Sequence, residues 1–111
     1  MRVAIVGSRS IILDDIGALL PPGVTEIISG GARGVDAAAH AWALSHGILL
    51  REFLPDYRRY GRSAPLRRNE EIIAAADHLL IIWDGVSPGT RHVLKRCVEI
   101  HKPFRLVMVR P

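Results

Sequence analysis

The stretch that decides the fold is residues 27–43, which read IISGGARGVDAAAHAWA. An apolar run ends at Ser29 and Gly30, and an alanine-rich segment follows that predicts a helix over residues 36–45, stopped by Gly47. A strand that passes into a helix through a glycine-rich corner is typical of parallel α/β proteins. The number of glycines at the corner raises the question of what its backbone approaches.

The same alternation of apolar runs and helical segments extends along the chain. With the strand before the glycine-rich corner, five strands are predicted, over residues 3–6, 26–29, 48–53, 78–83 and 104–109. Further helices are predicted over residues 14–20, from about residue 63, and over residues 90–101. Asp14 is expected to cap the first helix, and residues 54–62 are expected to be irregular. The pattern predicts one domain over residues 1–111, with a doubly wound, Rossmann-like parallel five-stranded sheet, order 3-2-1-4-5, and helices on both faces.

Some positions within these elements carry their own expectations. Arg51 and Glu52 interrupt an apolar run, which favours an edge position for the third strand. The helix that begins near residue 63 is expected to present one apolar face, and the last helix is expected to be buried at five positions. These residues are Leu66, Ile72, Ile73 and Ala76 in the former helix, and Val93, Leu94, Cys97, Val98 and Ile100 in the latter.

Composition limits the functional classes. The formal net charge of +4 comes almost entirely from arginine, since Lys95 and Lys102 are the only lysines. Arginine matches phosphate and carboxylate oxygens in pairs, but a solvated basic surface explains the charge equally well. The single cysteine, Cys97, allows no intrachain disulfide, and the N-terminal apolar run is too short for a signal peptide or membrane span. We therefore expect a cytoplasmic protein with no membrane association.

Three loops carry the candidate chemistry, namely residues 7–10 (GSRS), 29–36 (SGGARGVD) and 84–90 (DGVSPGT). In the predicted order they follow three neighbouring strands, so they should form one rim at the carboxyl ends of the sheet. Glycines let backbone N–H groups approach a ligand, and a helix N-terminus adds partial positive charge. Each loop also has a purely structural interpretation as a tight turn or helix cap, although Arg33 is not needed for a turn.

A second cluster lies in residues 55–69, where Tyr57 and Tyr60 could stack on a base while Arg58, Arg59 or Arg62 meets phosphate. A flexible basic loop is an equal alternative. Asn69, beside Arg68, suits hydrogen bonding to a ribose or base. No metal site is expected, because Cys97 and His101 lack a third ligand, and no Walker lysine follows the glycines.

Several of these segments recur in this order in one group of proteins. They are VGSR at residues 6–9, GGARGVD at 30–36, a Phe-x-Pro run ending at Pro55, YG at 60–61, RN at 68–69 and WDGVSPGT at 83–90. On these motifs the chain resembles the SLOG superfamily, and most closely its small YspA-type stand-alone proteins. The resemblance covers essentially the whole chain. It implies a Rossmann-like pocket for a nucleotide-derived ligand, a bacterial or phage setting, and a homodimer as one possible assembly.

Two branches of the superfamily supply the alternatives. The DNA-processing protein A branch, with a similar GARGxD run, implies single-stranded DNA binding. The Lonely Guy branch implies hydrolysis of a nucleoside monophosphate at its N-glycosidic bond, through the glutamate of a PGGxGTxxE motif. Here Gly89 and Thr90 match that motif, but Val93 occupies the position of the glutamate. Asp36, Glu70 or Asp84 would have to supply a carboxylate instead.

We therefore expect a nucleotide sensor or modulator, with N-glycosidic hydrolysis and single-stranded DNA binding as alternatives. No separate cofactor is expected. The residues expected to bind the ligand and its phosphate are Gly7, Ser8, Arg9, Ser29, Gly30, Gly31, Arg33, Gly34, Asp36, Arg68, Asn69, Asp84, Ser87, Gly89 and Thr90.

Overall fold

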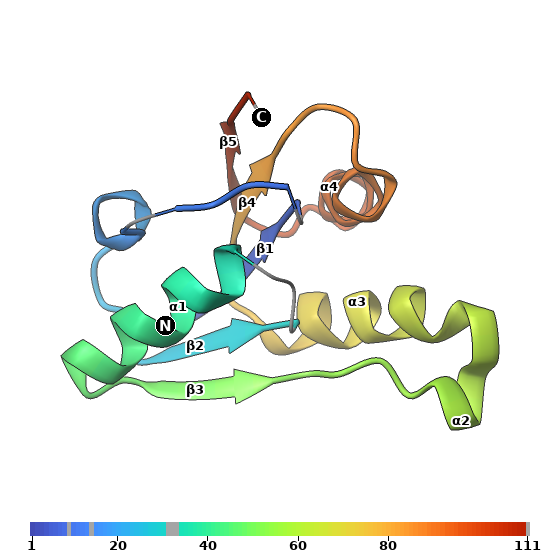
Figure 1. The fold of residues 1–111 in the computed structure, drawn as a ribbon, viewed down its shortest axis with the longest axis horizontal. Helices are drawn as coiled ribbons and strands as arrows, with labels where there is room; N and C mark the ends of the chain where they lie inside the picture. The colour runs from blue at the N-terminus through green and yellow to red at the C-terminus, as the bar shows by residue number, and fades with distance from the viewer. Residues whose placement is uncertain (9, 14, 31–33, 111) are drawn as a thin grey trace.

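The computed structural model describes residues 1–8, 10–13, 15–30 and 34–110. Five strands form one sheet in the order β3-β2-β1-β4-β5, and every neighbouring pair is parallel (Figure 1). The strands are β1 (Arg2–Gly7), β2 (Glu26–Ser29), β3 (Leu49–Glu52), β4 (His78–Trp83) and β5 (Phe104–Met108). The predicted fold class and strand order are confirmed, and β3 lies at an edge as Arg51 and Glu52 indicated.

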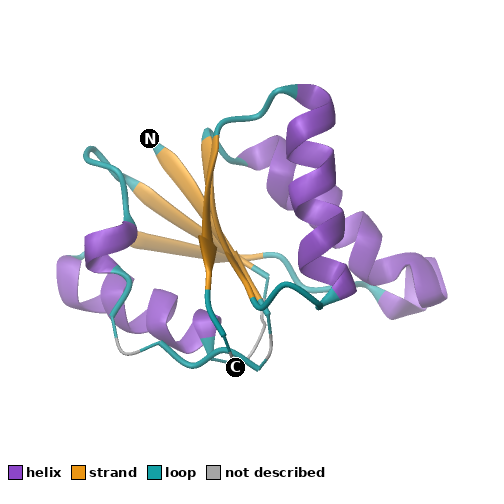
Figure 2. Ribbon diagram, turned by 90° about the horizontal axis from the view of Figure 1, so that it is seen from above, coloured by secondary structure: helices purple, strands orange, loops and turns teal. Residues whose placement is uncertain are grey.

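Helices cover both faces of the sheet (Figure 2). They are the 3-10 helix η1 (Gly17–Leu19), α1 (Val35–His46), the short α2 (Tyr57–Tyr60), the 3-10 helix η2 (Gly61–Ser63), α3 (Ala64–Ala75) and α4 (Pro88–Ile100). α1 packs on one face, whereas α3 and α4 pack on the other. No described helix is long and apolar enough to span a bilayer.

The two faces of the sheet have separate hydrophobic cores because successive strand residues point in opposite directions. Ile27 and Leu80 belong to the core beneath α1, and their neighbours Ile28 and Leu79 belong to the core beneath α3 and α4. All four side chains are fully buried. Strands buried on both faces explain the continuous apolar runs in the sequence.

The segment before β2 forms less helix than predicted. Only Gly17–Leu19 is helical, and it is a 3-10 turn, while Asp14, the expected cap, lies outside the described residues. Leu20 is already extended, with ψ at 144°. The reason is Pro21, since the residue before a proline is disfavoured in the α region.

The segment between β3 and α3 has more regular structure than predicted. Residues 54–62, expected to be irregular, contain α2 and the start of η2. Asp56 caps α2, because its carboxylate accepts a hydrogen bond from the Arg59 backbone N–H at 3.1 Å. Gly61, with φ at +56°, ends the helix. The capping aspartate was the sequence signal that the prediction overlooked.

The apolar face of α4 is narrower than predicted. Val93 and Cys97 are fully buried on α4, but Val98 and Ile100 are exposed. Since only one side of α4 contacts the sheet, residues spaced by four are covered and those between them face outward. The expectation that Val98 and Ile100 are buried is wrong. On α3, Ile72 and Ile73 are buried, whereas Leu66 is exposed.

Candidate functional site

The three loops singled out in the sequence meet at one edge of the sheet. They follow β1, β2 and β4, which are neighbours, so their carboxyl ends open on the same side. Between them and the first turns of α3 lies a cavity of about 470 Å³. It is lined by Ile5, Val6, Gly7, Ser8, Ser10, Gly30, Asp36, Pro65, Leu66, Arg68, Asn69, Ile72, Asp84, Ser87, Pro88, Gly89 and Thr90.

The cavity brings together most of the residues expected at the site. Those that line it are Gly7, Ser8, Gly30, Asp36, Arg68, Asn69, Asp84, Ser87, Gly89 and Thr90. Ser29 and Gly34 do not line it, while Arg9, Gly31 and Arg33 lie outside the described residues. Sequence reasoning missed Pro65, Leu66 and Ile72, which form an apolar wall. Leu66 is exposed in part because it lines this cavity.

Asp84 organises the turn between β4 and α4. Its carboxylate accepts hydrogen bonds from the Val86 and Ser87 backbone N–H groups at 2.9 and 2.8 Å, and from the Ser87 and Ser10 hydroxyls at 2.7 and 3.0 Å. These donors, above all the Ser87 hydroxyl and the two amides, lower the pKa of Asp84 far below its usual value. Asp84 therefore stays ionised and is committed to holding the loop.

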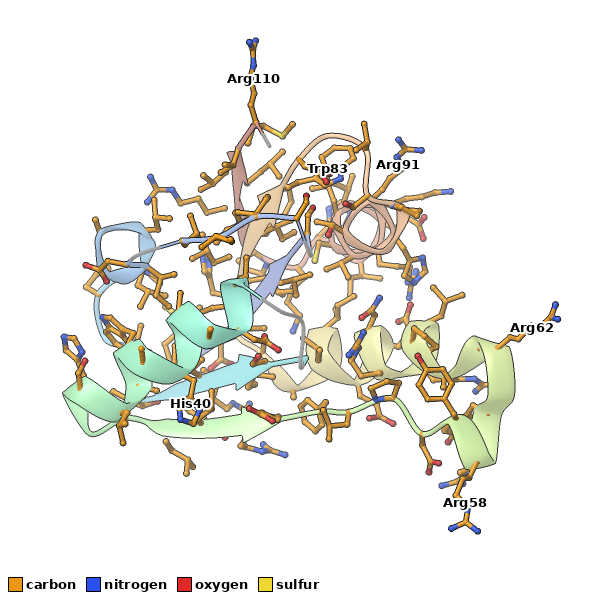
Figure 3. All side chains as sticks on the ribbon, in the orientation of Figure 1. His40, Arg58, Arg62, Trp83, Arg91 and Arg110 are labelled. Carbon is orange, nitrogen blue, oxygen red and sulfur yellow. The ribbon has the colours of Figure 1, made fainter. Side chains whose placement is uncertain are left out.

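Ser8 and Thr90 connect the ends of β1, β4 and α4 at the base of the cavity. The Ser8 hydroxyl accepts a hydrogen bond from the Asp84 N–H at 3.2 Å and lies 3.4 Å from the Thr90 hydroxyl. Both side chains are buried, at 2% and 4% exposure. On the outer side of the turn, the Trp83 indole donates to the Ser87 carbonyl at 3.1 Å (Figure 3 labels Trp83). The turn is held from both sides, so its amides have fixed positions.

The N-terminus of α4 points its remaining donors at the cavity. Arg91 N–H already bonds the Ser87 carbonyl, and Pro88 has no N–H. The Gly89 and Thr90 amides, by contrast, donate to no acceptor among the described residues. Two unpaired amides at a helix N-terminus, beside a cavity, form a site suited to an anion.

The structure requires glycine for different reasons at different positions of the site. A Cβ on Gly7 would lie 2.8 Å from the Val35 Cβ, so Gly7 is required by packing against α1. Gly34 has φ at +75° and lies against the Ile11 carbonyl, so it too is structural. A Cβ on Gly89 would meet no described atom outside its own helical turn within 4 Å. Gly89 therefore leaves space that belongs to the cavity rather than to the protein core.

Arg68 and Asn69 bring positive charge and an amide group from α3. Arg68 Nε donates to Asn69 Oδ1 at 3.0 Å, and its Nη1 donates to the Gly30 carbonyl. Asn69 is 7% exposed, and its Nδ2 donates to no acceptor in the parts of the chain that the structure describes. With its oxygen held by Arg68, the Asn69 amide nitrogen remains available as a donor to a ligand.

Asp36 is the carboxylate in the cavity wall that keeps one oxygen without a hydrogen-bond partner among the described residues. The Ser29 hydroxyl donates to Asp36 Oδ1, whereas Asp36 Oδ2 is buried without a partner among the described side chains. Burial raises the pKa of Asp36, and repulsion from Glu52 adds to this, against the opposing effects of Ser29 and Arg68. Asp36 can thus hold or accept a proton, which Asp84 cannot.

Neither Glu70 nor the position of the Lonely Guy glutamate is placed for hydrolysis. Glu70 lies outside the cavity lining and pairs with Arg96 Nε at 2.8 Å. Val93, at the position of the Lonely Guy glutamate, is fully buried in the core between the sheet and α3. Among the carboxylates expected to act in hydrolysis, only Asp36 both faces the cavity and has a raised pKa.

A parallel sheet in the order 3-2-1-4-5, with a cavity at its carboxyl edge beside a helix N-terminus, defines a Rossmann-like α/β protein. Residues 1–60 match the model of the YspA, cpYpsA-related SLOG family (YAcAr), and the chain belongs to that family. The matched part includes the loops after β1 and β2, but not the turn between β4 and α4. Membership indicates nucleotide-related binding or processing. Searches of curated proteins and of solved structures found no match.

Proposed function

We propose that the protein binds a nucleotide or nucleotide-derived ligand in the cavity and acts as a sensor or modulator. The observation that carries the proposal is the pair of unpaired amides at Gly89 and Thr90, facing a cavity of about 470 Å³. Their position suits a phosphoryl group, because its oxygens would accept hydrogen bonds from the two N–H groups and its charge would be stabilised by the helix dipole.

The rest of the cavity fits the remainder of a nucleotide. The Asn69 amide and the Asp36 carboxylate offer a donor and an acceptor for sugar hydroxyls or base edges. Pro65, Leu66 and Ile72 offer an apolar wall for a planar base. Arg68 adds positive charge between these groups.

The experiment is calorimetric titration of the purified protein with the common nucleoside 5′-monophosphates, preceded by native mass spectrometry to detect a copurified ligand. Asn69→Asp is the informative variant, because it keeps the acceptor for Arg68 and replaces the cavity donor with a negative charge. We expect the dissociation constant to rise on the order of tenfold or more. Lys95→Gln, on the exposed side of α4, changes the net charge equally and should leave affinity unchanged. Absence of binding by every nucleotide and of any copurified ligand would overturn the proposal.

One observation favours a second candidate, cleavage of the N-glycosidic bond of a bound nucleotide. Asp36 lines the cavity with a raised pKa and an unpartnered oxygen, as a general acid or base requires. Incubation with the same nucleotides and chromatography for free base tests this candidate. Release of base by the wild type but not by Asp36→Asn supports it, and no release by the wild type removes it.

A further inference from the structure

A second cavity of about 220 Å³ adjoins the first. It is lined by Leu54, Asp56, Arg59, Tyr60, Ala64, Arg67, Arg68 and Glu71, from α2, α3 and the segment before α2. Arg68 lines both cavities, so a single guanidinium group contributes to each. The two cavities are therefore neighbours that share this side chain.

Two arginines of the second cavity are held against an aromatic ring. The guanidinium carbons of Arg59 and Arg67 lie 5.2 and 5.0 Å from the centre of the Tyr60 ring. Stacking of this kind fixes the orientation of a guanidinium and leaves its N–H edge available. It also changes the expectation that Tyr60 stacks on a base, because its own arginines already cover the ring.

The charge in this cavity is incompletely balanced. No carboxylate of the described residues lies within 4 Å of the Arg59 or Arg67 guanidinium. One oxygen of Asp56 accepts the Arg59 backbone N–H as a helix cap, and Glu71 is exposed. Oriented guanidinium groups without anionic partners, lining a cavity, match the oxygens of a phosphoryl group.

We propose that the second cavity binds a second phosphoryl group of the ligand held in the first. The inference rests on the proposed function, and it specifies the ligand class as a nucleotide with two separated phosphoryl groups. One group would lie at the Gly89 and Thr90 amides, and the other at Arg59 and Arg67. Because the two cavities are neighbours that share Arg68, phosphoryl groups on the two sides of a nucleoside fit better than two adjacent ones.

The test compares the tightest-binding nucleoside 5′-monophosphate with the 3′,5′-bisphosphate of the same nucleoside by calorimetry. We expect the bisphosphate to bind on the order of tenfold more tightly or better. Arg67→Gln and Arg59→Gln should each remove most of this gain while leaving the monophosphate affinity within about twofold. Two substitutions are used so that the test still gives a result if one of the two variants does not fold.

The control is Arg62→Gln. Arg62 is exposed, lines neither cavity, and extends away from the rest of the molecule at the α2 end (Figure 3). It should keep the full gain from the second phosphoryl group. Equal affinity of the wild type for the two nucleotides would overturn this inference alone, and so would an equal loss in Arg62→Gln. Failure of every nucleotide to bind would instead overturn the proposed function on which it rests.

Discussion

Ser29, at the end of β2, donates its hydroxyl hydrogen bond to Asp36, in the first turn of α1. The contact closes the glycine-rich corner and holds Asp36 Oδ1, while Oδ2 is left buried without a partner among the described residues. Ser29 is 1% exposed, and its contact with Asp36 is partly buried. Burial raises the pKa of Asp36, so this carboxylate ionises less readily than a solvated aspartate does.

The first prediction concerns pH. Because burial raises the pKa of Asp36, the folded protein binds this proton more tightly than the unfolded chain does. The contribution of Asp36 to the free energy of unfolding should therefore decrease as pH rises from the ordinary aspartate pKa through the raised value. Asp36→Asn, which keeps the acceptor for Ser29, should gain stability relative to wild type over that range. Urea unfolding at several pH values between 4 and 7 measures the difference. A difference that does not change with pH would contradict the prediction.

The second prediction compares Gly7, which packs against α1, with Gly89, whose missing side chain leaves open space in the cavity. Gly89→Ala should keep or raise the free energy of unfolding, by up to about 1 kcal/mol, because the new Cβ meets open space and alanine favours the helix. It should nevertheless weaken nucleotide binding by narrowing the cavity. Gly7→Ala, in the same cavity wall, should cost about 1–3 kcal/mol because its Cβ collides with Val35. Thermal unfolding and calorimetry on both variants check this, and equal stability losses would count against it.

The third prediction concerns Ser8. Ser8→Ala leaves the Asp84 N–H without its acceptor in a partly buried position, so we expect a loss of about 1–3 kcal/mol in the free energy of unfolding. Ser45→Ala is the matched control, because the Ser45 hydroxyl is exposed on α1 and should contribute less than about 0.5 kcal/mol. Chemical denaturation of the two variants gives the comparison. A Ser8 variant as stable as the Ser45 variant would show that the hydroxyl does not support the turn.

The fourth prediction concerns the position of the Lonely Guy glutamate. Val93→Glu should not produce N-glycosidic hydrolysis, because the side chain would lie in the core rather than in the cavity. It should instead cost at least about 3 kcal/mol, since it buries a carboxylate without a partner. Val98→Glu, on an exposed position of the same helix, should change stability by no more than about 0.5 kcal/mol. Release of free base by a folded Val93→Glu protein at a rate above that of the wild type would contradict this placement.

Much of the fold could be predicted because its signals are local. Continuous apolar runs indicated strands buried on both faces, and β4 has the predicted bounds, His78–Trp83. The alanine-rich segment predicted α1 to within one residue at each end. The errors arose where a neighbouring residue overrides a weak pattern, as Pro21 does at Leu20 and Asp56 does at α2.

The sequence by itself determined the alternation of strands and helices, the family resemblance and the three candidate loops, because spacing, glycines and apolar periodicity are properties of the chain. The strand order was expected from the fold class, and the structure confirmed it. Only the tertiary structure decided which glycine faces open space and which carboxylate can hold a proton. It likewise decided that Arg68 lines two cavities. These properties depend on distances between residues far apart in the chain, such as Gly30 and Arg68, and on how completely each group is removed from water.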